Sequence, residues 1–480
     1  MKLATIDADD STMQSGPADI LSLQRSDFLR AGAPELSERL ADIRKLRDAV
    51  RQQSEEIAAV ISADFGNRSV HETMVADIWP ALASARHVLQ HLASWMKPRR
   101  VSVGLELMPG RARILYQPIG VAGIISPWNY PFQLAIVPLI AALAAGNRVM
   151  LKPSELTPRT SEFVAGFLGK LFPAEKVATI LGGPDVGAAF SALPFDHLFY
   201  TGSTAVGRRI MRAAAENLTP VTLELGGKSP CIIGNDAVMA SAAPSVAFGK
   251  LLNAGQTCVA PDYALVPRAR LDEFVDHIRQ AITRLYPSLR ANPDYTAIIN
   301  DRHYVRINSL LDEARRRGVR FLEVNPSNEK LPPAERKIVP SLLIDPPDDL
   351  AVMQDEIFGP VLPIRPYDSL DEAIEFVNGK PRPLALYYYG TTKIDRDKVL
   401  NRTVSGGASV NETLMHIVVE NLPFGGIGPS GMGAYHGEYG FQTFSHRKGV
   451  FLQSRINGSG MLRPPFGRAA NTMLKFLMNR

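Results

Sequence analysis

The chain has 480 residues, of which 45% are hydrophobic and 21% charged, as in a globular rather than a disordered protein. Its net charge of +5 is small for this length, and it has no long basic run, so we expect no nucleic-acid partner. Its only cysteines, Cys231 and Cys258, are too few for a disulfide framework and indicate a reducing compartment, which we take to be the cytoplasm.

The N-terminal part of the chain is expected to begin with a mobile stretch over residues 1–34. Acidic residues stand where a signal peptide would have its apolar region, so we expect no export signal. From Leu36 to Ile61, apolar residues recur at helical spacing, and Gly66 ends this stretch. A second helix is expected over residues 72–95.

Two patterns resemble ligand sites without completing them. The GGKS run at 226–229 looks like the end of a phosphate-binding P-loop, but the first glycine of that motif would fall at Thr222. His87 and His91 lie one helical turn apart, as metal ligands often do, but no third ligand accompanies them. We therefore interpret the two histidines as part of a solvated helix face and expect no metal site.

The segment between Arg113 and Arg148 carries no charged residue and is long enough to cross a membrane. Three prolines interrupt it, however. A buried strand over 120–125 and a buried helix over about 131–145 explain the segment better, because proline suits the first position of a helix. We expect no membrane span.

From residue 120 onward, strands and helices alternate, which predicts a parallel sheet with right-handed crossovers. In such sheets ligands bind at the carboxyl ends of the strands, where this chain carries SPWNYP, KPSE, YTGSTAVG and ELGGKSP. A second alternating unit runs from about 235 to 406. The expected elements are strands at 148–152, 177–181, 197–200 and 220–224, helices at 158–171, 205–214 and 271–285, a tail strand near 449–454 and a basic helix at 470–478.

Seven motifs occur in a fixed order: WNYPF, KPSE, YTGSTAVG, ELGGKSP, GQTCVAPD, EIFGPVLPI and LPFGGIGPSG. Together they resemble the NAD(P)-dependent aldehyde dehydrogenase superfamily, over nearly the whole chain after about residue 35. The ending GMGAYHGEYGFQTFSHRKGV resembles the dimeric class-3 branch, and FGKLLNAGQTCVAPDY is similar to bacterial coniferyl aldehyde dehydrogenases. The resemblance implies an α/β fold with a Rossmann-type cofactor domain, an α/β catalytic domain and a small bridging β-sheet.

Three residues match the family's catalytic positions. Cys258 matches the nucleophile, whose thiolate attacks the aldehyde carbon and later carries the acyl group as a thioester. Asn129 matches the side-chain donor to the oxyanion, beside the backbone N–H of Cys258, although an asparagine here also suits a turn. Glu224 matches the general base for thioester hydrolysis, which argues against transfer of the acyl group to coenzyme A.

Nine residues match the family's cofactor-binding positions, and NAD is the expected cofactor, with NADP as an alternative. A carboxylate at Glu155 favours the free 2′-hydroxyl of NAD. Phe358 would lie beside the nicotinamide, although core packing also explains an aromatic residue there. The nine are Trp128, Lys152, Glu155, Gly202, Ser203, Gly207, Leu225, Glu356 and Phe358.

Tyr130, Thr257, Phe424 and His436 are the expected substrate-pocket residues. Trp128, Tyr130, Phe132 and Phe424 supply aromatic surface near the expected site, which suits an aromatic or apolar aldehyde such as coniferyl aldehyde, although core packing also explains them. For His436 a purely structural hydrogen bond is an equal alternative. Medium- or long-chain aliphatic aldehydes are the alternative substrates. A catalytically silent binding protein on the same scaffold is the alternative of another class.

The expected domains follow from the resemblance. The cofactor domain takes 35–225 without 99–118 and adds about 414–436, and the catalytic domain takes 226–413. Segments 99–118 and 437–457 form the bridging sheet, whose apolar tail strand we expect to pair in a homodimer. The tail, 458–480, either packs on the partner subunit or makes a weak peripheral membrane contact.

Overall fold

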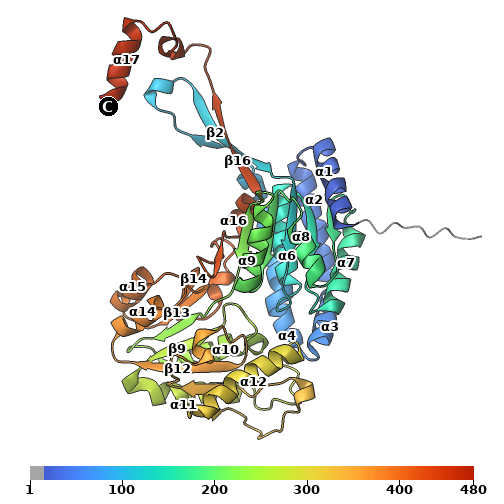
Figure 1. Cartoon of the computed structure of the whole chain (residues 1–480), viewed down its shortest axis with the longest axis vertical. Coiled ribbons are helices and arrows are strands. Elements are labelled where there is room, and N and C mark those ends of the chain that lie inside the picture. The colour runs from blue at the N-terminus through green and yellow to red at the C-terminus, as the bar shows by residue number, and fades with distance from the viewer. Residues whose placement is uncertain (1–15, 480) are drawn as a thin grey trace, which may run out of the picture.

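The structure is a computed structural model that describes residues 16–479. Its parts follow one another along the long axis in Figure 1, each built around its own β-sheet. In the described residues one sheet has six strands, one has seven and a small one has three. The expected α/β architecture of two large sheets and a small third sheet is confirmed.

The six-stranded sheet has the order β15-β7-β6-β3-β4-β5. All neighbours are parallel except β15, which pairs antiparallel with β7. Most residues of these strands are buried, as expected for a parallel sheet covered on both faces. The strands are β3 (Val121–Ile125), β4 (Arg148–Lys152), β5 (Val177–Thr179), β6 (His197–Thr201), β7 (Val221–Glu224) and β15 (Gly431–Met432).

Helices cover both faces of this sheet. Alternate residues of β3 separate the two cores: Ala122 and Ile124 join the core of α6, and Val121 and Ile125 join the core of α1 and α9. The helices are α1 (Pro17–Ala31), α2 (Leu36–Gln52), α3 (Ser54–Phe65), α4 (Val70–Thr73), α5 (Trp79–Trp95), α6 (Gln133–Ala145), α7 (Pro158–Leu171), α8 (Pro184–Ser191) and α9 (Thr204–Ala215).

The uncharged segment between Arg113 and Arg148 contains β3 and α6, as the strand-and-helix interpretation predicts. Every residue of α6 after the first is buried, because the helix lies between the sheet and the helices α2 and α5. Within residues 16–479, no helix is long and apolar enough to cross a membrane.

The seven-stranded sheet has the order β10-β11-β12-β9-β8-β13-β14, and only β10 is antiparallel to its neighbour. Its strands are β8 (Pro230–Ile233), β9 (Tyr263–Pro267), β10 (Arg320–Glu323), β11 (Ser341–Ile344), β12 (Val361–Tyr367), β13 (Ala385–Tyr389) and β14 (Gly407–Val410). Its helices are α10 (Met239–Leu251), α11 (Leu271–Leu285), α12 (Asp301–Arg316), α13 (Ala351–Gln354), α14 (Leu370–Asn378) and α15 (Lys393–Arg402).

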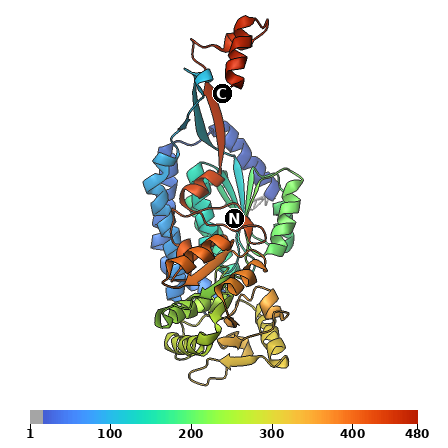
Figure 2. The ribbon, with the colours of Figure 1, turned by 90° about the vertical axis from the view of Figure 1, so that its left-hand side faces the viewer.

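The small sheet joins β1 (Arg99–Val101), β2 (Arg111–Pro118) and β16 (Ser445–Leu452), all antiparallel, with β16 at one edge. It extends away from the two larger parts, and α17 (Arg468–Met478) lies at its far end (Figures 1 and 2). Helix α16 (Gly437–Thr443) packs on α5 and α6. Of segment 437–457, therefore, only β16 belongs to the small sheet.

Two expectations for the N-terminal half are wrong. Residues 17–31 of the stretch expected to be mobile form α1, and Gln24 Nε2 donates to the backbone oxygens of Val149 (3.0 Å) and Ala174 (2.8 Å). Residues 1–15 lie outside the described residues. His87 and His91 are not on a solvated face: they are half-buried, their rings lie 4.4 Å apart, and both pack on Trp95.

Candidate active site

Cys258, Glu224 and Asn129 line one cavity of about 550 Å³ between the two large sheets. Asn129 follows β3, Glu224 is the last residue of β7, and Cys258 follows α10. The cavity thus opens at the carboxyl ends of the parallel strands, where the topology predicts a ligand site. The sequence motifs and the geometry point to the same place.

Cys258 is half-buried and follows a tight turn in which Asn253 and Ala254 have φ of 54° and 52°. Burial raises the pKa of the Cys258 thiol to about 12, and the carboxylates of Glu356 and Glu224 also act in that direction. The backbone N–H groups of Cys258 and Val259 act in the opposite direction, because they stabilise the thiolate. The thiol is therefore neutral in this state.

Asn129 is held from two sides. Its backbone oxygen accepts hydrogen bonds from Arg68 Nη1 and from Asn253 Nδ2, both at 2.9 Å. Its side-chain Nδ2 donates to the backbone oxygen of Gln256 at 3.2 Å. The amide is therefore fixed beside the loop that carries Cys258.

Glu224 is 2% exposed, and neither carboxylate oxygen has a hydrogen-bond partner within the described chain. Burial raises the pKa of Glu224 well above its usual range. A buried acid without partners is rare outside functional sites, because its charged form is so poorly solvated.

Six of the nine expected cofactor residues line the same cavity: Trp128, Gly202, Ser203, Leu225, Glu356 and Phe358. Ser203 caps α9, its Oγ accepting from the N–H of Val206 at 3.4 Å, so the positive end of the helix faces the cavity. Gly207 does not line the cavity, but a Cβ there would lie 2.7 Å from Leu225 Cδ2. It allows α9 to pack closely on the sheet.

Lys152 and Glu155 also lie outside that cavity lining. They pair at 3.3 Å where β4 ends, on the same edge of the sheet as the cavity. Glu356 lies inside the cavity: its Oε1 accepts from the N–H of Gly227 at 3.2 Å, and burial raises the pKa of Glu356 to about 7. His303 and Arg306 also line the cavity, from α12, and could not be predicted because no motif marks that helix.

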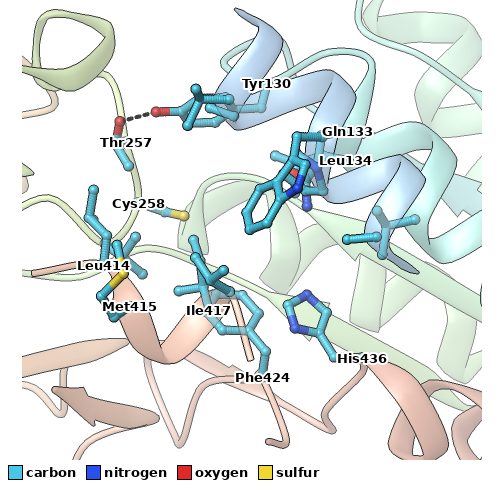
Figure 3. A pocket seen from close by; sticks show the side chains of 18 of the residues that line it. Tyr130, Gln133, Leu134, Thr257, Cys258, Leu414, Met415, Ile417, Phe424 and His436 are labelled. Atoms are coloured by element: carbon cyan, nitrogen blue, oxygen red, sulfur yellow. Dashed lines mark hydrogen bonds between the residues drawn. The ribbon is translucent and has the colours of Figure 1, made fainter. Parts of the chain in front are cut away.

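A second cavity, of about 220 Å³, reaches Cys258 from another direction. We call it the substrate cavity. All four expected pocket residues, Tyr130, Thr257, Phe424 and His436, line it (Figure 3). Tyr130 Oη and Thr257 Oγ1 form a hydrogen bond at 2.6 Å. Other lining residues that the motifs did not reveal are mostly apolar, such as Trp79, Leu134, Val137, Phe248, Leu414, Met415, Ile417 and Val418.

The two cavities share one reactive side chain, that of Cys258. A nucleophile placed between an apolar cavity and a larger one with a helix N-terminus suits a reaction between an apolar substrate and a phosphate-bearing cofactor.

Comparisons with known proteins point to the same kind of reaction. Residues 25–450 match the model of the aldehyde dehydrogenase family. A probable coniferyl aldehyde dehydrogenase of Pseudomonas aeruginosa is 48% identical over 96% of this chain and 96% of its own length. Aldehyde dehydrogenase family 3 member A2 of Macaca fascicularis is 40% identical over 95% of this chain and 93% of its own, which supports the class-3 resemblance.

Solved structures agree. The substrate-bound state of Staphylococcus aureus AldH has a TM-score of 0.90 and 38% identity, over 95% of this chain and 98% of that chain. Mycobacterium tuberculosis aldehyde dehydrogenase complexed with NAD+ has a TM-score of 0.81 and 28% identity, over 92% of each chain. This chain belongs to the aldehyde dehydrogenase family and is a nicotinamide-dependent aldehyde dehydrogenase.

Proposed function

We propose that this enzyme oxidises an aromatic aldehyde of the coniferyl aldehyde type to its carboxylic acid, with NAD+ and water as co-substrates. The observation that carries this proposal is the position of Cys258, at the junction of an apolar cavity and the cavity that faces the α9 N-terminus. The 48% identity to the Pseudomonas aeruginosa relative supports the choice of aldehyde.

In the first half of the reaction, Cys258 acts as the nucleophile. Its thiol gives its proton to solvent water, and the Sγ atom adds to the aldehyde carbon, whose C=O electron pair moves to the oxygen, to form a thiohemiacetal. The amide Nδ2 of Asn129 and the backbone N–H of Cys258 stabilise the oxyanion. To do so, Nδ2 exchanges its hydrogen bond to the Gln256 oxygen for one to the substrate.

The residues around the larger cavity fit a dinucleotide. Ser203 and the free backbone N–H groups at the start of α9 suit a pyrophosphate, and the Glu356 carboxylate in the cavity offers an acceptor for ribose hydroxyls. A bound nicotinamide would supply a hydride acceptor, so that oxidation of the thiohemiacetal would leave a thioester on Cys258. Glu155 near the end of β4 favours NAD over NADP.

In the second half, Glu224 acts as the general base. It accepts a proton from a water molecule, whose oxygen attacks the thioester carbon and releases the acid and the thiol of Cys258. The raised pKa of Glu224 suits this role, because a base must hold a proton firmly enough to remove it from water. Two glycines follow Leu225, the residue after Glu224, and the first of them, Gly226, leaves room for the Glu356 carboxylate: a Cβ there would lie 2.3 Å from it.

The test is NADH absorbance with a panel of coniferyl aldehyde, decanal and acetaldehyde, with and without coenzyme A. Coniferyl aldehyde should have a higher kcat/KM than acetaldehyde, since each buried methylene contributes about 0.8 kcal/mol. A higher kcat/KM for decanal would favour the alternative substrate class, medium- or long-chain aliphatic aldehydes. Stimulation by coenzyme A would indicate acyl transfer, and no NADH with any aldehyde would indicate a silent binding protein.

We also propose that two copies form a homodimer through the small sheet. The edge strand β16 exposes Phe451 and Leu452, at 46% and 45%, with unpaired backbone groups beside them. Pairing with a second copy would cover that edge, and α17 would pack on the partner subunit. The two cysteines are free, which supports placing the enzyme in the cytoplasm.

A further inference from the structure

Most of the substrate cavity is lined by apolar side chains. Besides Cys258, its polar lining residues are Tyr130, Gln133, Thr257, Glu420 and His436, and we call Glu420 and His436 its polar corner. The hydroxyl groups of Tyr130 and Thr257 are hydrogen-bonded to each other. Glu420 and His436 also line the cavity, and each has a buried atom, Oε2 and Nδ1 respectively, without a hydrogen-bond partner in the described chain. His436 is 6% exposed, so its unpartnered nitrogen is shielded from bulk solvent.

Glu420 and His436 lie next to one another. A Cβ on Gly437, the residue after His436, would lie only 2.4 Å from the backbone oxygen of Glu420. The N–H of Gly437 is also close enough to the Glu420 carboxylate to lower its pKa, although burial raises that pKa to about 7 overall. Nε2 of His87 is a third buried polar atom without a partner in the described residues, and the same Gly437 Cβ would lie 3.0 Å from it.

The backbone of His436, in the polar corner, is held in an unfavourable conformation. His436 has φ of 85°, a backbone region that residues with a side chain rarely adopt and that is typical of ligand sites. Its ring stacks on Phe424, with centroids 5.2 Å apart and 17° between the planes (Figure 3). Buried polar atoms without partners are rare in native proteins, so a ligand that supplies the missing partner is the simplest reason to keep them.

We infer that Glu420 and His436 form a subsite for the phenolic hydroxyl of a 4-hydroxycinnamaldehyde, an inference that rests on the proposed function. The hydroxyl donates a hydrogen bond to the Glu420 carboxylate, and the imidazole of His436 bonds to the hydroxyl oxygen or to a methoxy oxygen beside it. Burial lowers the pKa of His436 to about 3, so its imidazole is neutral. A straight-chain aldehyde offers no such donor, so this corner favours the aromatic substrate.

The experiment compares kcat/KM for 4-hydroxycinnamaldehyde and cinnamaldehyde, which differ only in the hydroxyl. The wild-type enzyme should favour the hydroxylated aldehyde by roughly tenfold, the effect of one good hydrogen bond. Glu420→Leu should bring this ratio close to one, whereas Glu420→Gln should keep part of it, because the amide oxygen still accepts. Met415→Leu is the matched control: it changes a lining residue without hydrogen-bonding capacity, and the ratio should stay at its wild-type value.

The wild-type enzyme alone gives a second measurement. 4-Methoxycinnamaldehyde keeps an oxygen for His436 but cannot donate to Glu420, so it should lose the part of the preference that Glu420 provides. A wild-type ratio near one, a wild-type ratio kept by Glu420→Leu, or equal preference for the methoxy and hydroxy aldehydes would overturn the subsite. No NADH from either hydroxylated or plain cinnamaldehyde would instead overturn the proposed function on which it rests.

Discussion

Arg68 and Asp77 form a fully buried ion pair, with Nη2 and Oδ2 2.7 Å apart. The second terminal nitrogen of Arg68, Nη1, donates to the backbone oxygen of Asn129. Oδ1 of Asp77 accepts from the N–H groups of Phe132 and Gln133. One pair of charges therefore fixes both the residue proposed to bind the oxyanion and the start of α6. We regard Arg68 as a positioning residue that acts through Asn129.

Removing one partner of this pair should destabilise the enzyme strongly. Asp77→Asn removes the carboxylate that pairs directly with Arg68 and leaves only the longer-range attraction of the buried Glu72, which should lower the free energy of unfolding by about 3–5 kcal/mol. Urea unfolding measures this value. Asp349→Asn is the control, because its pair with Arg317 is exposed and should contribute less than about 1 kcal/mol. Equal losses in the two variants would contradict the role given to the buried pair.

The proposed catalytic trio can be recognised in the sequence because each member stands in a short motif at a strand end or after a helix. Cys258, Glu224 and Asn129 need only local sequence to be recognised, and the fold brings them to one cavity. Arg68 and Glu420 could not be predicted in this way. Each is a charged residue in an ordinary stretch of sequence, and only packing of segments distant along the chain buries it.

The secondary structure, too, could be predicted from the sequence in some segments and not in others. The expected strands 120–125 and 148–152 match β3 and β4 within a residue, since the apolar residues at their centres are typical of strands buried on both faces. The helix expected over 72–95 is interrupted by a π-helical turn, Met74–Ile78, which ends before Pro80. Helix α1 was missed because Leu21 and Gln24 are its only fully buried residues, too few to produce a clear apolar stripe.

Glu224→Gln should separate the two half-reactions. Forming the thiohemiacetal and the thioester needs only Cys258 and the oxyanion donors, whereas hydrolysis also needs a base. The variant should release up to one equivalent of NADH per active site and then turn over roughly 10²–10⁴-fold more slowly than the wild type. Stopped-flow absorbance measures the burst, and mass spectrometry should find the acyl group on the peptide that contains Cys258.

Cys258→Ala is the control for this experiment and should give no burst at all, because no thiohemiacetal forms. An acyl group on Cys231 would contradict the assignment of the nucleophile. Turnover of Glu224→Gln at the wild-type rate would contradict the assignment of the base. Cys231 is fully buried, and burial raises its pKa far above the usual range, so we expect neither result.

The same substitution should change how stability depends on pH. The unfolded chain releases the Glu224 proton near pH 4.3, but burial raises the native pKa, so between these values the native state holds more protons. Stability therefore falls as pH rises through this window, by up to about 1.4 kcal/mol per pH unit from this group. Glutamine cannot ionise, so Glu224→Gln should not show this fall. The free energy of unfolding of the variant should therefore increase relative to that of the wild type from pH 5 to 8. Parallel pH profiles for the two proteins would contradict the burial of an ionisable Glu224.

The proposed dimer makes a prediction at the edge of the small sheet. Phe451→Glu should convert the dimer to a monomer at micromolar concentration, measured by sedimentation, because a two-fold contact between β16 strands would bring the two new carboxylates close together and bury them. Ile394→Glu is the control: Ile394 is 77% exposed on α15, far from the small sheet, and this variant should remain dimeric. A wild-type enzyme that sediments as a monomer would refute the dimer itself. A Phe451→Glu variant that stays dimeric would place the interface on another surface, since two like charges on neighbouring strands destabilise such pairing.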